Sequence, residues 1–255
     1  MFAGNRTSGL HVLDFGDGDN AFTGAGFLVV NPTPSNDTAT SGSRDRDTSY
    51  SAEVRFVGLD TFTHSGVIFL GGLDEGNNDS TNDGNRADDT VATDGWYDDV
   101  LSIPGAHFVG QDGEIVFDVA LGAASQPDCT TRNADGDLAA ADCLRLVGGS
   151  TEGRTFVTVV QETPGDRGGY DPDGILLVDV NGGTSAQGHF VIGPNTVGYN
   201  PQFGGMLDKG VFFYPIAYNE ETQQHFLVGL PGTAPHQFAL YGQVIDTVVP
   251  VSSTQ

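Results

Sequence analysis

The chain has 255 residues and a net charge of −24, because 34 Asp and Glu residues stand against ten Lys and Arg residues. Such a surface repels phosphate backbones and anionic lipids, so no nucleic-acid partner and no membrane-surface partner is expected. Apolar residues make up 38% of the chain, which is too many for a disordered acidic protein. No apolar stretch approaches the roughly 18 residues that a membrane helix needs. No signal sequence opens the chain, so any export signal is expected to have been removed or to lie upstream.

The apolar residues predict β-strands in chain order. They occur in short runs rich in Val, Ile, Phe and Leu, bounded by Gly, Asn, Asp or Pro, with almost no helical periodicity. The runs are Leu10 to Phe15, Phe27 to Val30, Val54 to Val57, Val67 to Leu70, Ile115 to Val119, Leu144 to Val147, Phe156 to Val160, Ile175 to Val180, Phe190 to Ile192 and Val211 to Tyr214. The intervals between them vary too widely for a meander of hairpins, so one continuous wound coil is predicted.

Two polar stretches, residues 31–51 and 74–99, interrupt this pattern. Both are longer than ordinary connections and are expected to be surface excursions from the coil. Excursions usually carry the binding specificity of such a protein. Solvated loops without a partner are the alternative.

Cys129 and Cys143 are the only cysteines, and they enclose an Asp-rich segment. No further Cys or CxxC spacing lies nearby, which argues against a zinc site. A disulfide formed in an oxidising compartment is therefore predicted, with two free thiols as the alternative.

The same segment contains the candidate calcium ligands Asn133, Asp135, Asp137 and Asp142. Their spacing follows much of an EF-hand loop, but Thr131 stands where the first Asp ligand belongs and no flanking helices are indicated. An acidic loop without metal is therefore expected, and no cofactor is predicted apart from this calcium candidate.

Motifs for catalysis are missing from the sequence. It has no G-x-S-x-G elbow, no H-E-x-x-H and no phosphate-binding glycine loop. Six histidines (His11, His64, His107, His189, His225 and His236) are scattered along the chain and are interpreted as surface or turn residues. Carboxylates and a cation for a polysaccharide-degrading site could come from Asp98, Asp99, Asp118 and Asp128 with Arg132 or Arg145, but nothing in the sequence places them together. The chain is expected not to be an enzyme, with a polysaccharide lyase or hydrolase as the alternative.

Five segments resemble, in the same order, the C-terminal pertactin-like passenger of autotransporters, the proteins of type V secretion. The segments are Val57 to Gly72, Asp98 to Gly122, Ala141 to Gln161, Asp171 to Gly193 and Lys209 to Gly229. The second, DDVLSIPGAHFVGQDGEIVFDVALG, is similar to the family pattern D-x-L-x-I-x-G-x-Y-x-G-x-x-G-x-I-x-L-D-x-x-L-G. The chain departs from the family in its cysteine-containing insertion, and in Phe226, where Trp or Tyr is usual.

The resemblance implies an all-β fold: a right-handed parallel β-helix (β-solenoid) in residues 1–208, followed by a C-terminal β-hairpin cap or autochaperone-like segment in residues 209–255. Phe212, Phe213, Tyr214 and Phe226 would form the core of the cap. The chain would be a monomeric scaffold and folding nucleus, and an adhesin, exported through the periplasm and outer membrane to the surface of a Gram-negative bacterium. Its partners would be its own outer-membrane β-barrel, absent from this sequence, and a host or neighbouring cell surface. A phage-type fibre is a further alternative.

Overall fold

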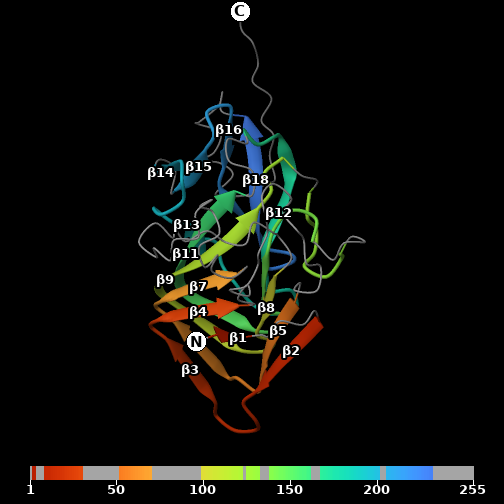
Figure 1. Cartoon of the computed structure of the whole chain (residues 1–255), viewed down its shortest axis with the longest axis vertical. Helices are drawn as coiled ribbons and strands as arrows, with labels where there is room; N and C mark the ends of the chain where they lie inside the picture. Colours follow the sequence, from red (N-terminus) through yellow and green to blue (C-terminus); the bar gives the residue numbers. More distant parts are fainter. Residues whose placement is uncertain are drawn as a thin grey trace, which may run out of the picture.

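The computed structural model describes residues 2–3, 9–30, 52–70, 99–122, 125–132, 138–161, 167–201 and 205–231. These residues form eighteen β-strands and no helix (Figure 1). The described part of the chain thus contains no helix with the length and apolar character of a membrane span.

The strands belong to two sheets. Sheet A contains β1 (Phe2–Ala3), β3 (Ala21–Gly24), β4 (Phe27–Val30), β6 (Thr61–His64), β7 (Val67–Leu70), β9 (His107–Val119), β11 (Ser150–Gln161) and β13 (Phe190–Ile192). Sheet B contains β2 (Gly9–Asp14), β5 (Ala52–Val57), β8 (Val100–Ser102), β10 (Cys143–Arg145), β12 (Asp171–Asp179), β14 (Tyr199–Asn200), β15 (Met206–Asp208), β16 (Phe212–Tyr214), β17 (Ile216–Asn219) and β18 (Gln224–Pro231).

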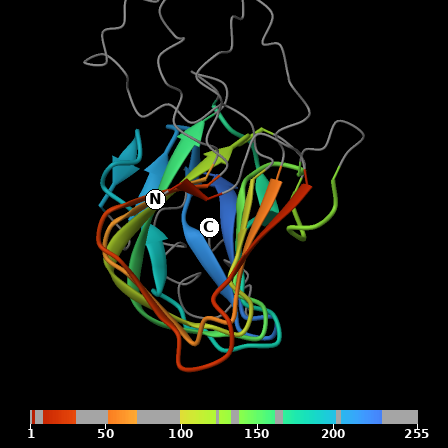
Figure 2. The same cartoon turned by 60° about the horizontal axis from the view of Figure 1, so that its bottom comes forward.

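The chain passes from sheet B to sheet A and returns, and each pass lies beside the preceding one. We call one such pass a layer: β2 to β4, β5 to β7, β8 and β9, β10 and β11, and β12 and β13. Strands of successive layers are parallel in both sheets. Figure 2 shows the two sheets meeting along a column of stacked turns and diverging away from it.

Glycine recurs at this column of turns, once in each layer. Gly16, Gly58, Gly105, Gly148 and Gly182 all have φ between 72° and 79°, a left-handed conformation that glycine adopts without steric strain. The turns also approach one another closely, since a Cβ atom on Gly58 would lie 2.3 Å from the carbonyl oxygen of Gly16. The repeated glycine therefore sets the direction of the turn in each layer, and Gly58 also allows the second turn to lie close against the first.

Side chains of both sheets fill the space between them, and a column of phenylalanine rings runs through this core. Phe22, Phe62, Phe108 and Phe190 come from β3, β6, β9 and β13 of sheet A, with ring centroids 5.0, 5.5 and 5.9 Å apart along the column. All but Phe22 are buried. Burying a ring of this size contributes roughly 1.5–3 kcal/mol, so the column links the stability of neighbouring layers.

The predicted fold class, a right-handed parallel β-helix with a hairpin cap, is wrong. The described strands form two separate sheets and do not close around the core: no described strand bridges the ends of β4, β7 and β11 to the next strand of sheet B. The sequences 31–51 and 71–98 are dominated by Asn, Asp, Ser, Thr and Gly, so they offer few apolar side chains for a third wall.

The C-terminal strands also differ from the predicted cap. β18 pairs with β12 in antiparallel orientation, and β16 and β17 both pair with β18. The hairpin therefore extends sheet B, which is parallel up to β12 and antiparallel beyond it. The domain boundary expected between residues 208 and 209 stays a prediction.

Candidate functional site

Four connections leave the layers along one side of the molecule, which we call the loop edge. Val30 of β4 lies opposite Leu70 of β7, and Val119 of β9 lies opposite Gln161 of β11, so the strands of sheet A end side by side. The strands of sheet B that come next begin side by side as well, since Val100 is in register with both Glu53 and Cys143. Residues 31–51, 71–98, 120–142 and 162–170 make these connections. The predicted excursions, residues 31–51 and 74–99, thus start and end at the loop edge. Apart from Asp99, their residues lie outside the described part of the chain.

Part of the third connection folds back over the outer face of sheet B. We call residues 125–132 and 138–142 the flap. Its Cys129 and Leu138 pack against Val100, Cys143 and Leu176 in an apolar cluster separate from the main core. Cys129 and Cys143, which the sequence predicted to be joined, form a disulfide with their Cα atoms 5.8 Å apart.

Gln126 fixes the start of the flap with a side chain that is fully buried. Its Nε2 donates to the carbonyl oxygens of Ala141, at 2.9 Å, and Leu176, at 3.0 Å. Its Oε1 accepts from the amides of Ala140, at 2.8 Å, and Ala141, at 2.9 Å. One side chain therefore satisfies four backbone groups that burial would otherwise leave unpaired.

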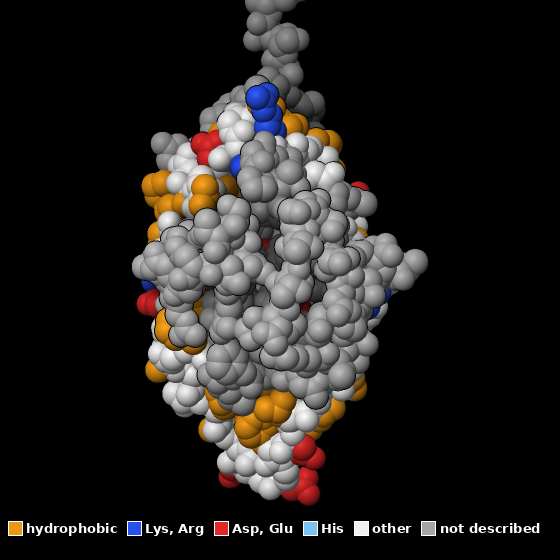
Figure 3. Space-filling model, viewed as in Figure 1, with side chains coloured by type: hydrophobic (Ala, Val, Ile, Leu, Met, Phe, Trp, Pro, Cys, Tyr) orange, Lys and Arg blue, Asp and Glu red, His pale blue; other side chains and the backbone are white. Residues whose placement is uncertain are grey.

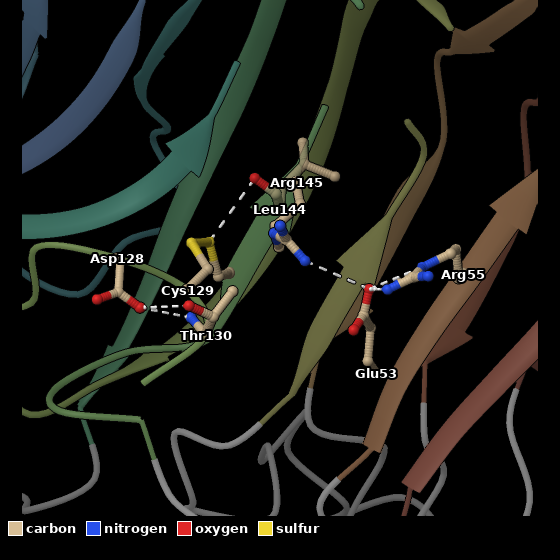
Figure 4. A network of polar contacts seen from close by, with 8 residues as sticks. Glu53, Arg55, Asp128, Cys129, Thr130, Leu144 and Arg145 are labelled. Atoms are coloured by element: carbon tan, nitrogen blue, oxygen red, sulfur yellow. Dashed lines mark hydrogen bonds and ion pairs between the residues drawn. A yellow bond between two sulfur atoms is a disulfide. The ribbon is translucent and has the colours of Figure 1, made fainter. Parts of the chain in front are cut away.

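Asp128 shapes the next turn of the flap, beside the disulfide (Figure 4). Its Oδ1 accepts from the amides of Thr130, at 2.7 Å, and Thr131, at 2.6 Å. Partial burial acts to raise the pKa of this carboxyl group, but the hydrogen bonds from Thr130 and Thr131 together outweigh burial and lower it to about 2. Asp128 is thus ionised and holds the turn at any physiological pH.

Of the four candidate calcium ligands, the structure describes Asp142 alone, so the calcium site stays a prediction. Asn133, Asp135 and Asp137 lie outside the described residues. Asp142 is buried, and its two carboxylate oxygens accept from the amides of Asp99, at 3.1 Å, and Asp118, at 2.7 Å. Within the described ranges no group of three or more His, Cys, Asp or Glu side chains could hold a metal ion.

Of the carboxylates considered for catalysis, the structure brings Asp99 and Asp118 together on either side of Asp142. All three side chains are 0% exposed, and the carboxylate of Asp142 bonds to backbone amides. Asp128 lies apart on the flap, and Asp98 is outside the described residues. This arrangement suits the joining of β8 to β9 better than contact with a polysaccharide.

An ionic network crosses the outer face of sheet B beside the flap (Figure 4). Glu53 Oε1 accepts from Arg55 Nη2 at 2.7 Å, and Arg145 Nη1 lies 3.5 Å away. Ion pairs with partly exposed side chains contribute at most about 1 kcal/mol. Arg145, the candidate cation of the enzyme hypothesis, therefore lies on the outer face with Glu53. Arg132 lies on the flap.

The residues expected to form a cap core are divided between the two faces of sheet B. Tyr214 is buried in the main core, where its hydroxyl donates to the carbonyl oxygen of Gly169 at 2.9 Å. Phe212 packs against the same core, whereas Phe213 and Phe226 pack outside it against Met206 and Val228. They stabilise β16 and β18 as strands of the sheet.

A cluster of imidazole and hydroxyl groups near β18 was missed by the sequence analysis. Ser185 Oγ lies 2.8 Å from His225 Nε2 and 2.7 Å from Thr151 Oγ1, which in turn lies 2.6 Å from His189 Nδ1. Its members are spread from residue 151 to residue 225, so no local motif reveals them. The one sequence signal is a histidine at the start of the apolar strand HFLVG.

The face seen in Figure 3 has acidic side chains at its lower tip, over the turn from β2 to β3. Hydrophobic side chains lie above them, and in the first layer Leu10, Val12 and Phe27 are exposed by half or more. Part of the negative charge of the chain is therefore exposed on the described surface, at the turn from β2 to β3.

No protein-family model matches the chain, and no curated protein matches it.

Proposed function

We propose that this chain is an extracellular scaffold, not an enzyme, and that it presents its long polar connections along the loop edge for binding to a cell surface. The observation that carries this proposal is the register of the strand ends: β4 with β7, β9 with β11, and β5 with β8 and β10. Stacked layers place successive connections side by side, and loops held on a rigid scaffold are where proteins usually bind their partners.

One further observation supports an extracellular location, and a second agrees with a scaffold that does not bind nucleic acid. The disulfide between Cys129 and Cys143 fixes the flap, and structural disulfides persist in oxidising compartments. A net charge of −24 keeps a protein soluble and disfavours contact with nucleic acid.

The finer proposal is that the chain is a monomeric passenger segment of an autotransporter, displayed on a Gram-negative cell and carried by its own outer-membrane barrel. It rests on the five collinear sequence segments alone. Digestion of intact cells that express the complete gene tests it: external protease should remove this segment, and protection of the segment inside the cell would contradict the proposal.

Replacement of residues 77–94 by a short Gly-Ser linker tests the scaffold proposal. The variant and the parent are compared for binding to a glycan microarray and to epithelial cell monolayers. We expect an unchanged urea midpoint and at least a tenfold loss of binding. The control is Val211→Ser, which changes an exposed side chain beside β16 and should bind as the parent does. Equal binding by the linker variant, or no binding by the parent to either surface, would refute the display function.

A polysaccharide-degrading enzyme is the alternative. Release of reducing or unsaturated ends from acidic glycans would favour it over the scaffold.

A further inference from the structure

His225 is enclosed by aromatic rings at the point where β18 meets the core. It is 1% exposed, its ring centroid lies 4.8 Å from that of Phe190 and 4.9 Å from that of Tyr218, and its Nε2 bonds to Ser185. Within the described residues its Nδ1 has no hydrogen-bond partner. A neutral imidazole carries one N–H, and a buried N–H without an acceptor is rare. The proton therefore belongs on Nε2, where Ser185 Oγ accepts it.

This placement sets the direction of the remaining hydrogen bonds. Ser185 Oγ accepts from His225, so its own proton points to Thr151 Oγ1. Thr151 then donates to Nδ1 of His189, which must be unprotonated at that atom. Because the Ser185 proton is directed away from His225, the pair is not an activated nucleophile with its base. It is one end of a one-way chain of donors from His225 to His189.

This chain of hydrogen bonds joins two parts of the fold that are far apart in sequence. Ser185 and His189 lie between β12 and β13, Thr151 lies on β11, and His225 lies on the C-terminal hairpin of β17 and β18. A second set of bonds holds the same loop: the amide of Ser185 donates to Gln223 Oε1 at 2.6 Å, and the Tyr218 hydroxyl donates to the Ser185 carbonyl oxygen at 2.8 Å. Beside the backbone ladder that joins β18 to β12, the hairpin is thus fastened to the loop at residues 181–189 mainly through Ser185.

We propose that this chain of hydrogen bonds is an acid-sensitive latch, in which a proton taken up at His189 Nδ1 loosens the C-terminal hairpin from the loop at residues 181–189. A protonated Nδ1 donates to Thr151, so the Thr151 proton turns to Ser185 Oγ. If Ser185 then accepts from both Thr151 and His225 Nε2, its own proton has no acceptor in this chain of hydrogen bonds. If Ser185 instead donates to His225 Nε2, the His225 proton moves to Nδ1, which has no partner among the described residues. Either outcome weakens the attachment of the hairpin.

The surrounding charges favour this order of events. Burial lowers the pKa of His189, and the carboxylate of Glu152 opposes that shift, so His189 is neutral near pH 7 and gains its proton below its ordinary value of 6.5. Burial, followed by the nearness of His189, lowers the pKa of His225 to about 3, so His225 stays neutral as His189 titrates.

Tyr218 and Asp179 are further titratable groups that form hydrogen bonds at this point of the hairpin and the loop. Burial, and next the carboxylate of Glu220, raises the pKa of Tyr218 above its ordinary value of 10, so its hydroxyl stays protonated. Asp179 of β12 accepts from Gln224 Nε2 at 3.0 Å and faces the neighbouring position of β18. Of the two imidazoles in this chain of hydrogen bonds, His189 is therefore the one that takes up a proton first as the pH falls.

Hydrogen exchange measured by mass spectrometry tests the latch, with protection factors corrected for the intrinsic pH dependence of exchange. The peptide covering β17 and β18 is compared with peptides of β9 and β11 at pH 7 and pH 5. We expect the protection of the hairpin to fall at least tenfold more than that of β9 and β11. Thr151→Val keeps the branched shape but removes the bridging hydroxyl, and it should abolish this difference between the two pH values. Ser150→Ala removes a neighbouring hydroxyl that is not part of this hydrogen-bond chain, and its hairpin should respond to pH as that of the parent does.

If protection in the parent falls equally in the hairpin, β9 and β11 between pH 7 and pH 5, the proposal is overturned. It is also overturned if the protection of the hairpin in Thr151→Val depends on pH as it does in the parent. The parent alone supplies an independent measurement that does not depend on the folding of any variant. Nitrogen-15 NMR of its imidazoles at pH 7 should show His225 protonated at Nε2 and His189 unprotonated at Nδ1. The opposite tautomer at His225 would also refute the latch.

Discussion

His64 should make the folded protein sensitive to acid, and His64→Gln should remove that sensitivity. The ring is 1% exposed, lies beside the stacked rings of Phe62 and Phe108, and its Nε2 is 3.0 Å from the carbonyl oxygen of Glu114. A Cβ atom on Gly113 would lie 2.5 Å from the ring, so the site has no room for a rearranged imidazolium. Burial lowers the pKa of His64 from 6.5 to about 4, although the hydrogen bond with Glu114 opposes the shift.

The sign of the effect comes from comparing the two states. Above pH 6.5 the imidazole is neutral in the folded and unfolded chains, and His64 has no influence on pH dependence. Between pH 6.5 and about 4 the unfolded chain binds a proton that the folded chain does not, so stability falls as the pH falls. At about 1.36 kcal/mol per pKa unit, the shift corresponds to a loss of about 3 kcal/mol below pH 4 and about 2 kcal/mol at pH 5.

Urea unfolding at pH 7.5, 6 and 5 measures this loss. A glutamine side chain does not titrate and keeps an N–H for the Glu114 carbonyl oxygen, so the stability of His64→Gln should fall by about 2 kcal/mol less than that of the parent between pH 7.5 and 5. The control is Val211→Ala, at a side chain that is 58% exposed and does not titrate, and it should follow the parent. Parallel curves for the parent and His64→Gln would show that the buried imidazole does not control acid stability.

Three further changes test the flap and the core by urea unfolding. Replacing Cys129 and Cys143 by Ala should lower the free energy of unfolding by about 3 kcal/mol, the entropy of a closed loop of about 15 residues, and an unchanged value would show that the flap is held by other contacts. Gln126→Leu leaves its four backbone partners unsatisfied and should cost about 3 kcal/mol or more; a loss below about 1 kcal/mol would mean that those groups find other partners. Phe108→Ala should cost about 3–5 kcal/mol, whereas Val197→Ala, at a side chain that is 87% exposed, should change stability by less than about 0.5 kcal/mol. Similar losses for these two variants would argue against the phenylalanine column.

The positions of many strands could be predicted because burial in a strand leaves a local mark on the sequence. Each predicted apolar run overlaps a strand, from Leu10–Phe15 on β2 to Val211–Tyr214 on β16. The strands that were missed, such as β3 (AFTG) and β6 (TFTH), contain one large apolar residue each. Their single ring joins the phenylalanine column, and a solitary aromatic residue has no periodicity to detect.

The way in which the strands associate was not predictable from such local marks. Strand runs alone do not distinguish a closed coil from two sheets, because the two folds differ in the connections that leave β4, β7, β9 and β11. The polar residues that organise the fold were also hidden. Gln126, Asp142 and His225 are buried, and their partners lie up to 50 residues away in sequence. A buried polar residue looks like a surface residue until its partner is known.

A pulling force should meet very different resistance along two directions of the layered stack. Backbone hydrogen bonds between parallel strands such as β5 and β8 lie roughly perpendicular to the strands, along the direction in which the layers succeed one another. Tension along that direction acts on the outermost ladder alone, so layers should peel away singly at low force. Tension along the strands instead shears the bonds of the pair β9 and β11 together, and this pair contains twelve residue pairs on the two sides of one register shift. The same protein would be compliant along the direction in which its layers are stacked and stiff along the direction of its strands.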